Sequence, residues 1–122
     1  MQIFAYPGDR VDFVSKSGSA GSLCFGDSRT LAEEFFGPAH EVAGEELSYY
    51  SGSLLLRFKA DSLKAVILRP SLSKHEKVEV YLNRTRLNGL DQNSLAQAIA
   101  AAGEGVTVRG AEGLEEIEVS AR

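Results

Sequence analysis

Residues 53–69, with the sequence Ser-Leu-Leu-Leu-Arg-Phe-Lys-Ala-Asp-Ser-Leu-Lys-Ala-Val-Ile-Leu-Arg, hold two apolar runs separated by a short polar turn. The first run places Leu54, Leu56 and Phe58 at alternate positions. Successive side chains of a β-strand point to opposite faces of the sheet, so this spacing predicts a strand with one buried face. One buried and one wet face is typical of antiparallel sheets. We therefore expect a hairpin whose turn covers residues 60–62.

The same alternation recurs along much of the chain. Together with flanking turn residues it predicts further strands at residues 2–6, 11–15, 22–25, 46–51, 77–83, 85–87, 106–109 and 114–120. The length of 122 residues suits one domain, because two halves of about 60 residues would each bury too little apolar surface to be more than marginally stable.

Two short helices are predicted between the strands, at residues 29–36 and 94–102. Each contains two residues with the spacing of an N-terminal capping box, and a glycine follows each helix: Thr30 with Glu33, and Ser94 with Gln97. The order of elements predicts an α+β fold in which residues 1–122 form one domain. Its expected architecture is a single antiparallel β-meander sheet with both helices packed on one face.

The two predicted helices begin with similar sequences. Segments 26–35 and 90–99 share an Asp, a Ser or Thr, a Leu-Ala pair, a Glu or Gln and a later apolar residue, at a constant offset. A duplicated unit of helix plus meander would produce this similarity. The start of any amphipathic helix would also produce it, so both interpretations stay open here.

Charge is unevenly distributed along a chain of ordinary globular composition, with 43% hydrophobic and 25% charged residues and a net charge of −4. Residues 31–51 contain five Glu and neither Lys nor Arg. Residues 52–90 contain eight basic and three acidic residues, and residues 91–122 contain six acidic residues and two Arg. This composition argues against disorder and against a disulfide-stapled miniprotein.

Catalytic and metal-binding signatures are not evident in the sequence. Cys24 is the single cysteine, expected to be buried, and the histidines His40 and His75 fall in predicted loops. We therefore expect no metal, no cofactor and no enzymatic activity. Net negative charge opposes a nucleic-acid partner. Because no apolar stretch is long enough to span a membrane and the N-terminus does not resemble a signal peptide, we expect a cytoplasmic protein without a membrane partner.

The acidic segment contains the candidate binding residues. One of two adjacent Tyr residues in a strand is expected to face outward, where an aromatic ring can anchor a partner while surrounding carboxylates select a basic one. The residues expected to bind a partner are Glu33, Glu34, Glu41, Glu45, Glu46, Tyr49 and Tyr50. Charge reversal at Glu45 and Glu46 is expected to weaken binding with little loss of thermal stability.

One part of the chain resembles known bacterial proteins. Residues 23–38, Leu-Cys-Phe-Gly-Asp-Ser-Arg-Thr-Leu-Ala-Glu-Glu-Phe-Phe-Gly-Pro, precede the Tyr pair 49–50 and the apolar strand 54–58. This unit resembles one found in the outer-membrane assembly lipoprotein group and in the β-lactamase-inhibitor-protein-like fold, and it is similar to small bacterial immunity proteins. The chain departs from the lipoproteins in having no signal segment and no anchoring Cys near its start. The resemblance implies a binding module without catalytic chemistry.

Together these observations predict a non-catalytic protein-binding module. Its most concrete form is a bacterial immunity or inhibitor protein, a monomer or weak dimer, that neutralises a basic toxin or enzyme by stoichiometric binding. The alternative is a small ligand-binding protein or enzyme of unknown substrate, with a pocket between the sheet and the helices. A third class is a module that self-associates through an edge strand.

Overall fold

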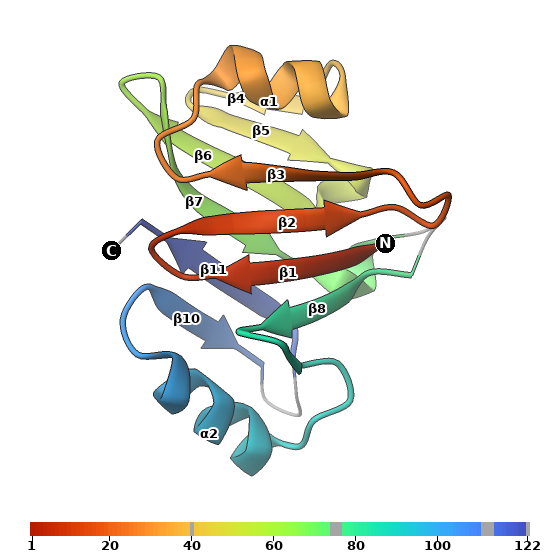
Figure 1. Cartoon of the computed structure of the whole chain (residues 1–122), viewed down its shortest axis with the longest axis vertical. Coiled ribbons are helices and arrows are strands. Elements are labelled where there is room, and N and C mark those ends of the chain that lie inside the picture. The colour runs from red at the N-terminus through yellow and green to blue at the C-terminus, as the bar shows by residue number, and fades with distance from the viewer. Residues whose placement is uncertain (40, 74–76, 111–113, 122) are drawn as a thin grey trace.

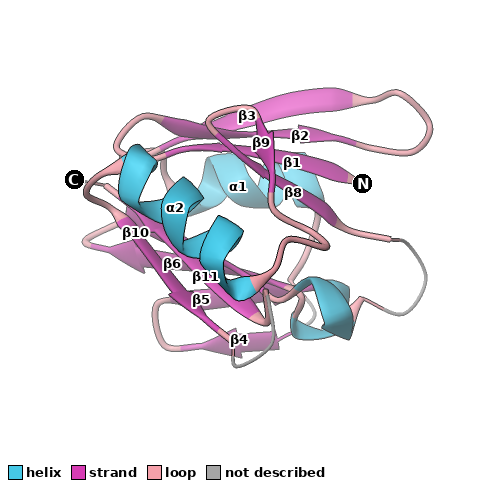
Figure 2. Cartoon of the chain, turned by 90° about the horizontal axis from the view of Figure 1, so that it is seen from below, coloured by secondary structure: helices cyan, strands magenta, loops and turns pink. Residues whose placement is uncertain are grey.

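The computed structural model describes residues 1–39, 41–73, 77–110 and 114–121. Their strands form two sheets that lie face to face, and two helices lie at opposite ends of this sandwich (Figures 1 and 2). The strand elements predicted from alternation are present, and a short additional strand lies at residues 41–43.

The five-stranded sheet has the order β3-β2-β1-β8-β9 and mixes antiparallel with parallel pairing. Its strands are β1 (Gln2–Tyr6), β2 (Arg10–Val14), β3 (Ala20–Cys24), β8 (Glu79–Leu82) and β9 (Thr85–Arg86). β1 pairs with β8 in parallel, with Ile3 opposite Val80, so the first strand joins segments far apart in the sequence.

The six-stranded sheet has the order β10-β11-β7-β6-β5-β4 and is antiparallel throughout. Its strands are β4 (Glu41–Ala43), β5 (Glu46–Tyr49), β6 (Leu54–Lys59), β7 (Ser62–Leu68), β10 (Val106–Arg109) and β11 (Glu116–Ser120). Short 3-10 turns follow β5 and β7, at η1 (Tyr50–Gly52) and η2 (Pro70–Leu72). The predicted β6–β7 hairpin forms the middle of this sheet.

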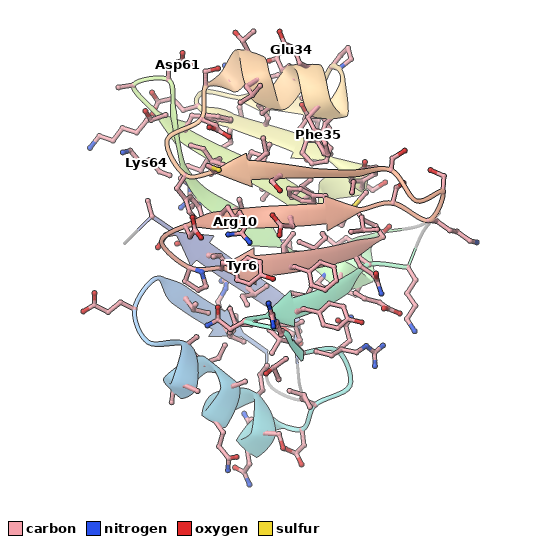
Figure 3. All side chains as sticks on the ribbon, in the orientation of Figure 1. Tyr6, Arg10, Glu34, Phe35, Asp61 and Lys64 are labelled. Carbon is pink, nitrogen blue, oxygen red and sulfur yellow. The ribbon has the colours of Figure 1, made fainter. Side chains whose placement is uncertain are left out.

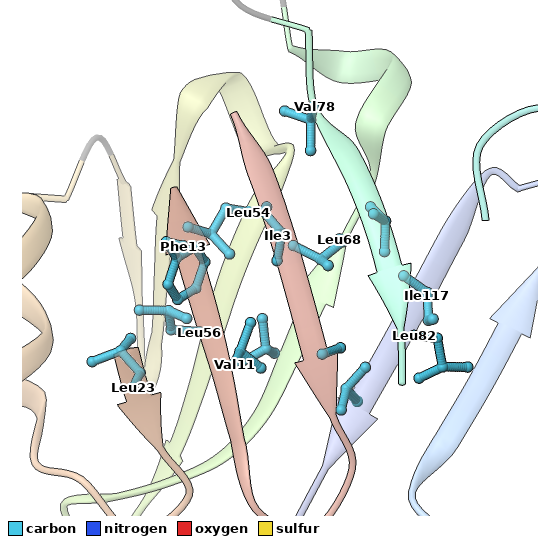
Figure 4. Close-up of a cluster of buried hydrophobic side chains, with 14 of the residues drawn as sticks. Ile3, Val11, Phe13, Leu23, Leu54, Leu56, Leu68, Val78, Leu82 and Ile117 are labelled. Atoms are coloured by element: carbon cyan, nitrogen blue, oxygen red, sulfur yellow. The ribbon is translucent and has the colours of Figure 1, made fainter. Parts of the chain in front are cut away.

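The hydrophobic core fills the space between the two sheets (Figure 4). Each sheet contributes the apolar side chains of its inner face, including Ile3, Val11 and Phe13 from one and Leu56 and Leu68 from the other. These side chains are at most 2% exposed. At about 25 cal/mol per Å² of buried apolar area, this shared layer is the main source of folding free energy.

The expectation of a single sheet carrying both helices on one face is wrong. The strands bury their apolar faces against a second sheet, and each helix connects the two layers. α1 (Arg29–Phe36) leads from edge strand β3 to edge strand β4, and α2 (Gln92–Ala102) leads from edge strand β9 to edge strand β10. A short helix with few buried residues cannot cover a sheet face, so each instead closes one end of the sandwich (Figure 1).

The helix caps differ from the predicted capping boxes. The Ser28 side chain accepts from the Leu31 N–H at 3.2 Å and begins α1, and the Asp91 side chain accepts from the Ser94 N–H at 2.7 Å and begins α2. Hydrogen bonds from Ser94, the backbone N–H first, lower the pKa of Asp91 below its ordinary value. No helix within the described ranges is long and apolar enough to cross a bilayer.

Candidate functional site

The start of α1 is fixed to the tip of the β6–β7 hairpin. Gly26 N–H donates to the Leu63 carbonyl at 2.9 Å, and Leu63 N–H donates to the Asp27 carbonyl at 2.8 Å. The Asp61 carboxylate, at the hairpin tip, accepts from the Arg29 N–H at 3.1 Å (Figure 3). A carboxylate on a free N–H in the first turn of a helix is favourable both as a hydrogen bond and with the helix dipole. The start of α1 is therefore held against the six-stranded sheet.

The apolar side chains of α1 point in two directions. Ala32 is fully buried, and Phe36 packs edge-on against Phe13 with 4.9 Å between ring centroids. Leu31 and Phe35, one turn apart, remain 43% and 41% exposed. Phe35 lies between α1 and β3 (Figure 3), over Gly21, where a Cβ atom would overlap its ring.

Three of the predicted glutamates are exposed at the α1 end of the sandwich. Glu34 projects outward from α1 (Figure 3), Glu41 lies on β4, and Glu45 lies in the turn between β4 and β5. None of the three forms an ion pair with another described residue. Val42, between them on β4, is 56% exposed. We call Glu34, Glu41, Glu45, Leu31, Phe35 and Val42 together the acidic end.

The other two predicted glutamates pair within the chain. Glu33 accepts from Arg29 at 3.1 Å along the helix, and Glu46 accepts from Arg57 at 2.8 Å across the β5–β6 pair. Reversing the charge at Glu46 would place a lysine against Arg57, so the expectation of little stability loss does not suit this position. Glu45 alone remains suited to that experiment.

Neither predicted tyrosine is fully exposed. Tyr49 is 3% exposed and its hydroxyl donates to the Gly37 carbonyl at 2.9 Å, while burial raises the pKa of its phenol. It therefore fastens the end of α1 to β5. Tyr50 is half-buried, with its ring 6.4 Å from the Phe36 ring, and is the one of the pair that a partner could contact without rearrangement of the core.

Sequence reasoning missed the exposed apolar side chains of the acidic end. The i, i+4 spacing of Leu31 and Phe35 places both on one face of the helix but does not show that this face remains exposed. The signal that could have found them is the width of the apolar stripe: an eight-residue helix with four apolar side chains, at positions 31, 32, 35 and 36, has more apolar surface than one packed face covers.

The outer face of the six-stranded sheet is charged but not basic. Arg57 lies between Glu46 and Glu118, and Glu116 lies between Arg69 and Arg109, with N–O distances of 2.7–3.0 Å. The hydrogen bond to Glu46 raises the pKa of Arg57. Burial opposes ionisation of Glu116, but the hydrogen bonds from both arginines outweigh it and lower its pKa. Two arginines of the basic segment, Arg57 and Arg69, are thus paired on this face with glutamates of the acidic segments on either side.

A hollow lies elsewhere in the described structure, between η2, the start of β8 and the loop into α2. Its volume is about 730 Å³, and Lys77, Asn88 and Asp91 supply polar atoms to its lining. Asn88 is already engaged, because its side chain accepts from the Val80 N–H and donates to the Val78 carbonyl. A small-molecule site between sheet and helix would lie here.

The cysteine, the two histidines and possible metal ligands add no candidate catalytic or metal site among the described residues. Cys24 is exposed on β3, contrary to the expectation of burial. His40 and His75 lie outside the described residues. Within the described ranges, no three His, Cys, Asp or Glu side chains are grouped so that they could hold a metal ion.

Comparison of the chain with protein-family models, with curated proteins and with solved structures found no match. The case for function therefore depends on the surfaces described above.

Proposed function

We propose that the chain is a non-catalytic protein-binding module that recognises a basic protein through the acidic end. The observation that carries the proposal is the coincidence of apolar exposure with unpaired negative charge. Three of the four large apolar side chains that are exposed in the described structure belong to this end: Leu31, Phe35 and Val42. Apolar contact surrounded by charge is the arrangement of protein interfaces, in which the charge steers and selects the partner.

The concrete form of the proposal is a bacterial inhibitor or immunity protein. It acts in the cytoplasm as a monomer or weak dimer and covers a basic cleft of a toxin or enzyme in a stoichiometric complex. The resemblance of residues 23–38 to immunity proteins supports this form, since that run supplies the end of β3 and the whole of α1. The lack of Lys and Arg from residue 31 to residue 51 supports a basic partner.

The test uses the product of the gene adjacent to the one that encodes this chain, co-expressed with the tagged chain. We expect a one-to-one complex by light scattering. The Glu34→Lys/Glu45→Lys variant should weaken it by about 10- to 100-fold in calorimetry, because two steering charges are reversed.

The charge-matched control is Glu104→Lys/Glu115→Lys, which changes two exposed glutamates elsewhere on the chain. It should bind like the wild type. Equal loss in both double variants, or no loss in either, would show that the acidic end does not bind the partner.

A ligand-binding protein or enzyme is the second candidate, favoured by the 730 Å³ hollow near α2. A thermal-shift screen of metabolites separates the two. A ligand that raises the melting temperature of the wild type, and no longer does so after Lys77→Ala, would favour the hollow. Asp91 is unsuitable for this variant because it begins α2.

A further inference from the structure

We infer that the partner is held in part by strand pairing: an extended, basic segment of the partner adds to the five-stranded sheet along β3. This inference rests on the proposed function and specifies what the acidic end receives. Addition of a peptide strand to an open sheet edge is an established mode of protein recognition, in which backbone hydrogen bonds give affinity and alternate side chains give specificity.

The four edge strands of the two sheets are not equally protected. β9 has two residues and contains Arg86, β4 has three and contains Glu41, and β10 contains Arg109. β3 is the longest of the four, with the uncharged sequence Ala-Gly-Ser-Leu-Cys. Natural edges are commonly blocked by shortness, charge or proline. β3 has none of these, so it is the edge that remains able to pair.

The hydrogen bonds of β3 show which of its backbone groups are available. Phe25 N–H donates to the Asp9 carbonyl at 3.0 Å, and Ser15 N–H to the Ser19 carbonyl at 2.8 Å. Because bonded and non-bonded pairs alternate along an antiparallel ladder, the pairs that contain Ala20 and Ser22 are non-bonded. The N–H and C=O groups of Ala20 and Ser22 therefore point away from β2, toward the open edge.

The end of the edge is closed by the chain itself. The outward N–H of Cys24 donates to the Asp27 carboxylate at 2.8 Å, and its carbonyl accepts from the Asp27 N–H at 3.0 Å. No such partner among the described residues meets the outward groups of Ala20 and Ser22. Four backbone groups in a row, two donors and two acceptors, are thus presented to an incoming strand.

α1 beside this edge determines the side chains of that strand. Side chains of an added strand alternate between two faces. On the inner face they meet Phe35, which rests on Gly21, and Leu31 one helical turn away. That contact favours apolar residues. Exposed Glu34 lies on the same helix, in a segment without Lys or Arg, so the negative charge beside this edge favours a segment that also contains Lys or Arg.

The direct test is an NMR titration of the ¹⁵N-labelled chain with the synthetic peptide Lys-Val-Lys-Val-Lys-Val-Lys. We expect hydrogen exchange of the Ala20 and Ser22 amides to slow by about tenfold at saturation, as for amides that gain a partner in a sheet. The peptide Glu-Val-Glu-Val-Glu-Val-Glu and a backbone N-methylated form of the basic peptide should leave both amides unchanged. Unchanged exchange with the basic peptide, or protection at β4 instead, would overturn the inference.

Ser22→Pro removes one outward donor and leaves the bonds between β2 and β3 intact, because proline is tolerated where the N–H faces an open edge. The hydroxyl of Ser22 donates to Asp12 at 2.6 Å, so Ser22→Ala is the matched control that loses the same side-chain bond. We expect Ser22→Pro to weaken basic-peptide binding by about tenfold and Ser22→Ala to leave it nearly unchanged, since one backbone hydrogen bond distinguishes them. Equal effects would contradict strand pairing, and the wild-type amide exchange decides the matter should Ser22→Pro not fold.

Failure of this inference is distinguishable from failure of the proposed function. In one outcome, the chain forms a one-to-one complex that depends on Glu34 and Glu45, but the basic peptide does not slow exchange of the β3 amides. That result supports the proposed function and contradicts strand pairing. In the other outcome, the peptide protects the Ala20 and Ser22 amides, but no complex depends on the acidic end. That result supports strand addition at β3 and contradicts recognition of a basic protein by the acidic end.

Discussion

Ser53 is a buried polar residue whose hydroxyl has no hydrogen-bond partner in the described structure. It is 1% exposed, and its backbone is fully used, because its N–H donates to the Tyr50 carbonyl at 3.1 Å and its carbonyl accepts from Arg69 at 2.8 Å. These backbone hydrogen bonds fix the position of Ser53, so its hydroxyl is buried without a hydrogen bond to offset the loss of contact with water.

We expect Ser53→Ala to leave the free energy of unfolding unchanged or to raise it by up to about 1 kcal/mol, because burial of an unpaired hydroxyl costs free energy. Urea unfolding followed by circular dichroism measures this. Ser22→Ala is the control, since it removes a hydroxyl that is bonded to Asp12 and should lower stability by about 0.5–1 kcal/mol. A loss of 1 kcal/mol or more at Ser53 would contradict the assignment of an unsatisfied group.

At the scale of the element, α1 shows how far sequence reasoning reaches. Its bounds were predicted correctly because local signals set them: the apolar stripe over residues 29–36 and the Gly-Pro that stops the helix. Its cap was assigned to Thr30, yet Ser28 begins the helix. Ser28 and Thr30 are chemically similar cap formers, and what separates them is contact with a hairpin more than thirty residues away, which no local pattern reports.

That contact gives the second stability prediction, at Asp61. Asp61 has a positive φ of 63° at the tip of the β6–β7 hairpin, and its carboxylate accepts from the Arg29 N–H. Asp61→Gly keeps the turn and removes the acceptor, whereas Asp61→Asn keeps an acceptor and tolerates the same backbone conformation.

We expect Asp61→Gly to lower the free energy of unfolding by about 1 kcal/mol and to speed hydrogen exchange of the Arg29 amide, with a smaller effect for Asp61→Asn. Chemical denaturation and hydrogen exchange measure the two effects. If Gly and Asn behave alike, α1 is not held by this hydrogen bond.

At the scale of the whole molecule, alternation predicted the strands but not their sorting into two sheets. The parallel pair of β1 and β8 joins residues more than seventy positions apart, and such pairing depends on tertiary packing and not on local propensity. One signal was available: residues 65–68 of β7 are uninterrupted Ala-Val-Ile-Leu, and all four are buried. A continuous apolar run indicates a strand covered on both faces. β7 lies inside the six-stranded sheet, between β11 and β6, where one face packs on the second sheet and Ile67 on the other face lies among the ion-paired side chains.

The candidate site could be predicted only in part, because pairing between strands is not visible in the local sequence pattern. The sequence identified where the negative charge lies, but pairing across the sheet decides which carboxylates remain exposed. Glu46 faces Arg57 across the β5–β6 ladder, whereas Glu45 lies in the preceding turn. Likewise the backbone of β5 turns Tyr49 inward. Adjacent residues thus have opposite roles, set by strand register.

The ion pairs on the outer face of the six-stranded sheet make stability depend on pH through Glu116. Its side chain is 16% exposed, and both Arg69 and Arg109 bond to it at 2.7 Å. Partial burial raises its pKa, the two arginine hydrogen bonds lower it by more, and the folded-state pKa lies below the ordinary value. The unfolded chain thus takes up this proton before the folded chain does. Glu116 stabilises the fold fully above its unfolded pKa, and that stabilisation is lost as pH falls through the folded pKa.

We therefore expect Glu116→Gln to destabilise the chain at pH 7 and to lose part of that effect at about pH 3, which lies below the ordinary pKa of a glutamate, so that unfolding of the wild type is coupled to proton uptake there. Urea titrations of both proteins at the two pH values give the difference in unfolding free energy, and Glu34→Gln, which removes an exposed carboxylate, is the control. Arg69→Gln should reproduce the effect of Glu116→Gln at pH 7 in part, because Arg109 retains its bond to the carboxylate. The difference in unfolding free energy between wild type and Glu116→Gln could instead be the same at both pH values. In that case the contacts of Glu116 with Arg69 and Arg109 would stabilise the sheet by packing and not by charge.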